Sequence, residues 1–194
     1  MDGRAHTGRR RNEQVRRDIL AASLSLVTEA GPDGFTMQKL AERAGVSKRT
    51  IYRWWSSRAA VIAEALTDRA GSTVRTAPPP STVDDRPLGD LRVFLSTTFR
   101  GASAPDVAPA LRLLMAEAQA GGEPAEELRR FVGIRRAALR TLVAAARDRG
   151  DLPATTDVDL VTDVAFGVLW YRLLVGHAPL DEHTADGIIA LLGG

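Results

Sequence analysis

Apolar residues recur at helical spacing over most of the chain. In residues 11–30 they fall at positions i, i+4, i+7 and i+11, which is the spacing of one face of an α-helix. These apolar positions are Val15, Ile19, Ala22 and Leu26. The pattern predicts a first helix that ends at Gly31 and Pro32, because a proline at this point cannot continue the helix.

Two short helices are predicted next, over residues 36–55. Thr36 supplies a hydroxyl N-cap for a helix of about two turns that Gly45 ends. Ser47 caps an equally short helix that runs from residue 48 to about residue 54, with Ile51 facing inward. Because Ala41 is small and glycine permits a tight turn, the two helices can approach closely. This arrangement is typical of a helix-turn-helix unit.

A fourth helix is predicted to begin after Ser56 or Ser57 and to end near Gly71, and it is followed by a proline-rich linker over residues 72–87. Further helices are predicted at about 88–101, 106–120, 124–149, 157–176 and 182–192. Thr156 and Asp159 resemble a capping box at the start of one of them. No segment alternates as a half-buried strand would, so the sequence predicts an all-α protein.

The predicted domains are a disordered basic arm, a DNA-binding domain, the linker and a C-terminal helical domain. The arm is residues 1–11, which carry four arginines and no apolar periodicity. The DNA-binding domain is residues 12–71, and residues 88–194 form the C-terminal domain. With 194 residues, the chain is long enough for each region to bury a core.

Composition excludes several classes of function. The chain has no cysteine, which rules out disulfides, thiolate metal sites, iron–sulfur clusters and a cysteine nucleophile. No apolar run approaches the ~18 residues of a membrane span, and no secretory signal is evident. We therefore expect a cytoplasmic protein. G-x-S-x-G, H-E-x-x-H and a glycine-rich phosphate loop are all missing, so we expect neither an enzyme nor a cofactor.

The net charge of +2 hides an asymmetry along the chain. Residues 1–60 carry 12 Lys and Arg against 6 Asp and Glu, whereas residues 61–194 carry 14 against 18. A basic head on an acidic body indicates that the head binds a polyanion. Arginine accounts for 24 of the 26 cations, but genomic base composition explains that preference, so arginine content alone does not indicate phosphate binding.

The predicted second short helix carries polar and cationic side chains on the face opposite Ile51. These side chains are Ser47, Lys48, Arg49, Thr50, Tyr52 and Arg53. A helix in the major groove needs this mixture of donors for base edges and of hydroxyls and cations for phosphates. The alternative is a generic helix pair with a solvated face, but the basic head and the adjacent Trp54 and Trp55 favour DNA binding.

The stretch GFTMQKLAERAGVSKRTIYRWWSSRAAVIAEAL resembles the N-terminal signature of TetR/AcrR-type transcriptional regulators, over about residues 12–70. The shared features are G-x-x-x-x-T, A-x-x-A-G-V-S and the aromatic end of the third helix. The resemblance implies a helix-turn-helix domain followed by a helical bundle for ligand binding and dimerisation. It also implies a homodimer that binds a palindromic operator and releases it when a small-molecule effector binds.

The resemblance also implies which residues contact DNA. By position these are Thr36, Gln38, Lys48, Arg49, Thr50, Tyr52, Arg53, Trp54 and Arg58, which join Ser47 from the exposed face above. Arg58 stands where family members usually carry lysine, and an arginine preserves a phosphate contact. Tyr52 is expected to contact a phosphate through its hydroxyl, although a ring packed between helices is the alternative. Trp55 is expected to lie in the core.

Residues 157–176 are apolar nearly all round, so both sides of this helix need a cover. The same helix of a second subunit would cover one of these sides. With the last helix, it would form a two-fold interface between the subunits. The candidate interface residues are Val161, Val164, Val168, Ile188 and Leu192. Burial of the helix within a single subunit is the alternative.

Aromatic residues and a methionine of the predicted C-terminal domain are candidates for an effector pocket. Candidate pocket residues are Phe94, Phe99, Met115, Phe131, Phe166 and Trp170, although plain core positions would show the same spacing. Arg112 and Glu117 are better explained by a solvated face than by a charged pocket. His177, Asp181, Glu182 and His183 have no specific metal-ligand spacing, so we expect no metal site.

Three functions remain possible from the sequence. A ligand-responsive repressor is favoured, and a DNA-binding protein without an effector is the second. An enzyme or carrier with a vestigial DNA-binding head is the third, and the intact cationic helix argues against it. The first two differ in whether a small molecule lowers the affinity for the operator.

Overall fold

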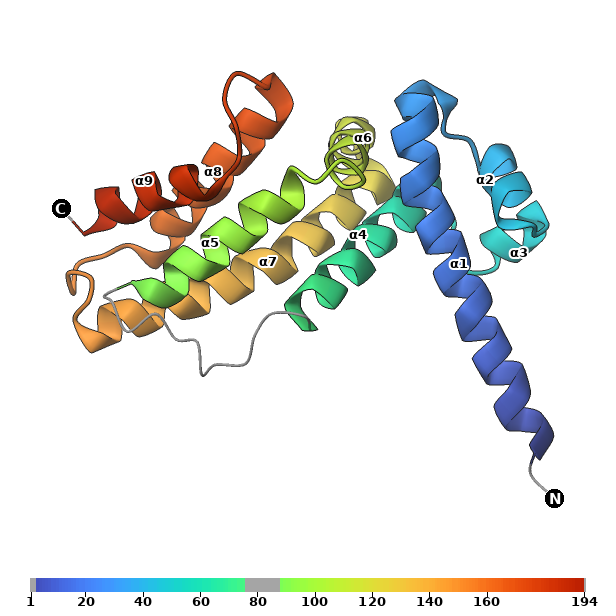
Figure 1. Cartoon of the computed structure of the whole chain (residues 1–194), viewed down its shortest axis with the longest axis horizontal. Coiled ribbons are helices and arrows are strands. Elements are labelled where there is room, and N and C mark those ends of the chain that lie inside the picture. The colour runs from blue at the N-terminus through green and yellow to red at the C-terminus, as the bar shows by residue number, and fades with distance from the viewer. Residues whose placement is uncertain (1–2, 76–87, 194) are drawn as a thin grey trace. The chain divides into compact units, whose positions relative to one another are not determined.

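The computed structural model describes residues 3–75 and 88–193, and the side chains of residues 12–71 and 88–193. Within these ranges the chain is helical and contains no strand, which confirms the predicted all-α fold (Figure 1). The helices are α1 (Gly3–Gly34), α2 (Met37–Ala44), α3 (Lys48–Tyr52), α4 (Arg58–Arg75), α5 (Gly89–Ala102), α6 (Ala108–Ala118), α7 (Gly122–Arg149), α8 (Val158–Val175) and α9 (Glu182–Leu192).

The chain divides into two compact units. The head unit comprises residues 1–69 and 109–128, and the bundle unit comprises residues 70–108 and 129–194. The first division lies close to the boundary expected near Gly71, but α6 and the first two turns of α7, up to Leu128, group with the head. The reason is physical: Leu113 and Leu114 of α6 are buried, and Glu117 of the same helix pairs with Arg58 of α4.

Helix α1 differs from the expectation in residues 3–11, where the backbone is helical instead of a disordered arm. Arginine and alanine favour helix, and extending an existing helix costs far less free energy than nucleating one. Residues 1 and 2 lie outside the described residues. The helix breaks where the sequence predicted, because Gly31 has φ 69° and ψ 178° and Pro32 follows it.

In the bundle unit, α5 lies against α9 and α8. Arg92 of α5 donates to Asp186 at 2.6 Å and to Glu182 at 2.8 Å, and these carboxylates raise the pKa of Arg92. Arg136 of α7 pairs with Asp163 of α8. The apolar core of the unit is formed by Leu91, Leu95, Phe99, Leu139, Val143, Leu169, Leu173 and Ile188.

Two helix ends differ from the sequence prediction. Asp157, and not Thr156, caps α8, because its carboxylate accepts hydrogen bonds from the backbone N–H groups of Asp159 at 3.0 Å and Leu160 at 3.1 Å. Aspartate is a strong N-cap residue. Helix α4 continues past Gly71 to Arg75, since a single glycine weakens a helix without breaking it. Residues 76–87 of the predicted linker lie outside the described residues.

Candidate DNA-binding site

The turn between α2 and α3 has the local geometry that the sequence predicted. Thr36 Oγ1 accepts a hydrogen bond from the backbone N–H of Lys39 at 3.2 Å and caps α2. Gly45 ends α2 in the left-handed region with φ 64°, where glycine has no side chain to strain the backbone. Ser47 Oγ then accepts from the backbone N–H of Thr50 at 3.1 Å and caps α3. These caps set the two helices in a helix-turn-helix unit.

Helix α3 presents a cationic surface to solvent. Ile51 is fully buried, whereas Lys48, Arg49 and Arg53 are exposed and Tyr52 keeps 50% of its surface accessible. Ser47, Arg49, Thr50, Tyr52 and Arg53 line a shallow, open depression. Residues 46–57 hold three cations and no acidic side chain. We name residues 47–50, 52 and 53 the α3 face; all are exposed except Thr50, which is half-buried. This face offers hydroxyl and cationic groups without a carboxylate to repel phosphate.

The loop after α3 is anchored by Trp55, which is buried as expected. Its Nε1 donates to Glu64 Oε2 of α4 at 2.9 Å, and Glu64 also pairs with Arg16 of α1 at 2.6 Å. Trp54 meets the Trp55 ring edge-on at a centroid distance of 5.5 Å, and the Arg53 guanidinium lies 4.8 Å from the Trp54 ring centroid. These contacts fix the C-terminal end of α3 on α1 and α4.

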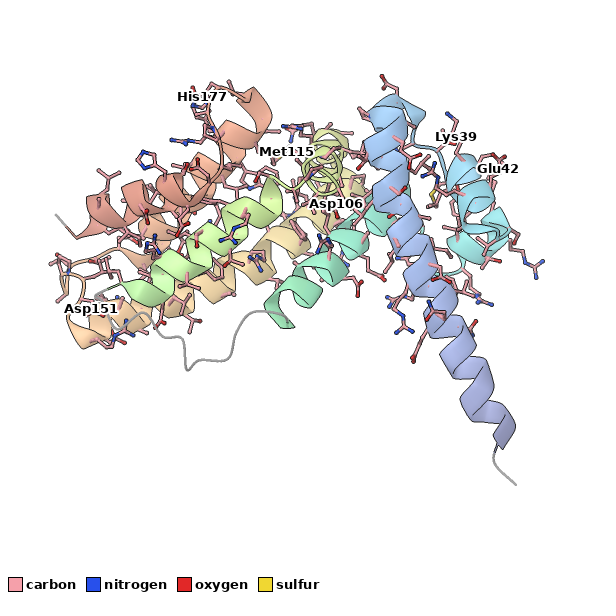
Figure 2. All side chains as sticks on the ribbon, viewed as in Figure 1. Lys39, Glu42, Asp106, Met115, Asp151 and His177 are labelled. Carbon is pink, nitrogen blue, oxygen red and sulfur yellow. The ribbon has the colours of Figure 1, made fainter. Side chains whose placement is uncertain are left out.

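A second anchor joins α2 to α1. Arg43 of α2 donates to Glu29 and, at 2.6 Å, to Ser25 Oγ, both on α1. The hydrogen bonds from Arg43 and Ser25 lower the pKa of Glu29 from its ordinary value of 4.5 to about 2. Figure 2 shows Lys39 and Glu42 on the outer side of α2, where both are exposed. Gln38 Nε2 donates to this Glu42 at 2.6 Å, so the Gln38 amide remains on the surface.

Arg58, which is expected to contact a phosphate, also has partners within the head unit. Its guanidinium donates to the backbone oxygen of Phe35 at 3.0 Å and pairs with Glu117 of α6, and that pairing raises the pKa of Arg58. Nearby, Ser56 donates to Glu123, while Ser57 caps α4 by accepting from the N–H of Ala60 at 3.2 Å. Sequence spacing could not show this, because Glu117 lies 59 residues from Arg58. We therefore interpret Arg58 as a residue that positions α4.

We expect Glu117→Gln to weaken operator binding in the same direction as Arg58→Gln. Both changes break the pair that holds the first turn of α4, directly after the α3 loop. The expected loss is about 1 kcal/mol, or about fivefold in the dissociation constant, because the pair is partly exposed. A gel-shift titration measures it, with Glu126→Gln on exposed α7 surface as the control. Unchanged or tighter binding by Glu117→Gln would instead indicate that the freed guanidinium contacts phosphate.

The predicted pocket residues belong to two different units of the chain. Phe99 and Phe166 are buried in the bundle unit, and Phe94, Phe131 and Trp170 are half-buried there. Met115 belongs to α6 of the head unit, whereas the other five belong to the bundle unit. Arg135 was missed by the sequence prediction; the signal available was a cation four residues from both Phe131 and Leu139 on an apolar stripe.

The predicted interface residues differ in their exposure to solvent. Val164 is exposed, and Val161, Val168 and Leu192 are half-buried. Ile188 is buried within the bundle unit, because α9 packs against α5, so it is not available to a second subunit. Further exposed apolar residues on the two helices expected at the interface are Leu160, Tyr171, Leu174, Val175 and Leu191.

No group of three or more His, Asp or Glu side chains among the described residues could hold a metal ion. His177 lies in the loop after α8 (Figure 2), where its ring is 4.6 Å from the Tyr171 ring. In the described part of the chain, no helix has the length and the apolar character needed to cross a membrane.

The all-α fold and the cationic α3 face define a DNA-binding protein of the helix-turn-helix class. The family profile described as bacterial regulatory proteins, tetR family, matches residues 19–65, and the profile described as tetracyclin repressor-like, C-terminal domain, matches residues 85–192. The HTH-type transcriptional regulator YdeS of Bacillus subtilis is 32% identical over 189 residues, covering 96% of this chain and 92% of the relative. The chain belongs to the TetR family of bacterial transcriptional regulators.

Other relatives and solved structures agree with this assignment. The HTH-type regulator AqdR of Rhodococcus erythropolis is 27% identical over 183 residues, covering 93% of this chain and 84% of AqdR. The TetR family regulator SCO0332 is 28% identical with a TM-score of 0.68, covering 93% and 98% of the two chains. FadR of Bacillus subtilis, solved with stearoyl-CoA, has a TM-score of 0.70 at 16% identity, covering 91% and 97%, and shares the fold. The chain is therefore a DNA-binding transcriptional regulator.

Proposed function

We propose that the protein is a cytoplasmic repressor that binds a palindromic operator as a homodimer and is released by a small-molecule effector. Each protomer inserts α3 into the major groove, and the two helices lie one helical turn apart, about 34–36 Å, or a multiple of that distance. Lys48 and Arg49 contact base edges or phosphates from the α3 face. Thr36 and Gln38, at the start of α2, contact the sugar–phosphate backbone of the DNA.

The α3 face is the observation that supports DNA binding in this proposal. Its three cations and three hydroxyls are held on a short helix that is capped at Ser47 and anchored through buried Ile51 and Trp55. A rigid element that presents donors and no acceptor carboxylates is what groove recognition requires. The intact face argues against a vestigial head, and nothing in the described residues favours an enzyme over a regulator.

The effector part rests on the bundle unit. Phe94, Phe131 and Trp170 are half-buried there, so aromatic surface is available to an apolar ligand. A fold relative, FadR of Bacillus subtilis, was solved with stearoyl-CoA. A ligand lowers the operator affinity only if it binds the DNA-free arrangement more tightly, and a coupling of ~1–3 kcal/mol is typical. A DNA-binding protein without an effector is the alternative.

Selection from random double-stranded DNA by the purified full chain tests the proposal. We expect enrichment of a palindrome whose half-site centres are one helical turn or a multiple apart. Footprinting on the selected operator should protect both half-sites. Enrichment of asymmetric sites would contradict the dimeric model, and a failure to enrich any sequence would contradict specific operator binding. Copies of the selected site in the genome then identify a promoter. Transcription from this promoter measures repression by the protein and release by an effector.

A further inference from the structure

Arg135 interrupts the apolar stripe of α7. Leu139 and Val143 of this helix are buried, and Phe131 is half-buried. Arg135 stands one turn after Phe131 and one turn before Leu139, so it shares the face that these side chains occupy. Burying a charged guanidinium on such a face removes water from it. This costs free energy unless a hydrogen-bond acceptor or an opposite charge replaces the water.

Two side chains of α5 hold this guanidinium, and both are neutral. Arg135 Nη2 donates to Thr98 Oγ1 at 2.7 Å, and the Arg135 Cζ atom lies 5.2 Å from the centroid of the Phe94 ring. Phe94 and Thr98 are four residues apart on α5 and therefore lie on one face. Burial lowers the pKa of Arg135, whereas the carboxylates beside Arg92 raise the pKa of that residue.

Among the described residues, Arg135 has no carboxylate partner. Arg136, the next residue on α7, pairs with Asp163, and Arg92 pairs with Asp186. A guanidinium has five N–H donors, and the Thr98 hydroxyl accepts from only one of them. The Arg135 residue is half-buried, so part of its surface remains accessible to solvent.

We propose that Arg135, Thr98, Phe94 and Phe131 form a subsite that binds the anionic end of an amphipathic ligand, either a carboxylate or a phosphate monoester. The planar guanidinium donates paired hydrogen bonds to two oxygen atoms of the anion. Thr98 and the Phe94 ring fix its orientation, and the phenylalanine rings contact the apolar body. This inference deepens the proposed function, since it names the chemical class of the effector.

Calorimetric titration of the full chain with octanoate, octyl phosphate and 1-octanol tests the subsite. The three probes share one alkyl chain and differ in the head group. We expect octanoate or octyl phosphate to bind at least about tenfold more tightly than 1-octanol, because hydrogen bonds to charged groups exceed neutral ones by about that factor. The anion that binds more tightly identifies the head group as carboxylate or phosphate.

Variants assign the preference to Arg135. Arg135→Gln is expected to bind the anions and 1-octanol about equally, and Arg136→Gln, which removes a neighbouring cation paired with Asp163, is expected to keep the wild-type preference. Circular dichroism checks that helicity is retained. Thr98→Val leaves the guanidinium in place but removes its anchor, and it should reduce the preference several-fold even if Arg135→Gln fails to fold.

Three outcomes would overturn the subsite: no preference for an anion in the wild type, an unchanged preference in Arg135→Gln, or an equal loss in Arg136→Gln. The operator titration separates this inference from the proposed function. In the absence of octanoate and octyl phosphate, Arg135→Gln should bind the selected operator as tightly as the wild type. Addition of the preferred anion should release the wild type from the operator but should not release Arg135→Gln. Anion binding without release would support the subsite and contradict effector control.

Discussion

Replacing Lys48 and Arg49 together with alanine is expected to weaken binding to the selected operator by at least about a hundredfold. A base contact typically carries ~1–3 kcal/mol, and each 1.4 kcal/mol is about a factor of ten. In the proposed homodimer, the variant removes two exposed cations from each of the two α3 helices, and both cations belong to the α3 face. Helicity should not change, because neither side chain is buried.

The salt dependence of binding separates the roles of the two cations. Removing a cation that binds a phosphate should flatten the slope of log affinity against log salt by up to about 0.9 per lost contact, or about 1.8 for the two protomers of the proposed dimer, whereas removing one that binds a base changes the preferred sequence. The single variants therefore show which cation reads bases. Arg100→Ala, which removes an exposed cation from α5 of the bundle unit, is the matched control. Wild-type affinity in the double variant would mean that α3 is not the recognition helix.

The sequence predicted the local geometry of the turn between α2 and α3 well because its signals are local. Thr36, Gly45 and Ser47 each act on backbone groups within four residues, so a short stretch of chain determines both caps and the turn. The burial of Ile51 and Trp55 follows from the same short pattern. The caps, the turn and these buried side chains are therefore expected in any tertiary arrangement that buries the apolar face of α3.

Non-local partners could not be predicted in the same way. Arg58 pairs with Glu117 at a separation of 59 residues, and Arg135 bonds to Thr98 at 37 residues. Periodicity shows that a helix face is apolar, but it does not show which element covers that face. Ile188 illustrates the point: it was expected at a subunit interface and is instead covered by α5 of its own chain.

One face of α8 remains apolar and uncovered within the described part of the chain. Its exposed residues, which follow helical spacing, are Leu160, Val164, Tyr171, Leu174 and Val175. The opposite face carries the buried residues Thr162, Ala165, Phe166, Leu169 and Leu173. An apolar stripe of this kind on a soluble helix is typical of an interface, and a second copy of α8 related by a two-fold axis would match it. Leu191 of α9, which is 82% exposed, extends the exposed apolar surface.

We expect Val164→Arg to convert a wild-type dimer into a monomer and to weaken operator binding by about 10²–10⁴-fold. Val164 belongs to the exposed α8 stripe, with 47% of its surface accessible. If the two-fold axis passes close to it, the two introduced arginines would approach each other. An unpaired pair of like charges at such an interface is strongly unfavourable. Losing the dimer removes the gain from binding two half-sites with linked heads, which typically amounts to that factor.

Light scattering beside an operator titration measures both effects on the same samples. Val93→Arg is a close control, because Val93 on α5 is also a valine and is 48% exposed, yet it lies outside the α8 stripe. This control should remain a dimer and bind the operator normally. The head unit of Val164→Arg is unchanged in sequence, so its loss of affinity would come from assembly alone. A monomeric wild type, or a dimer that tolerates arginine at Val164, would place the interface elsewhere.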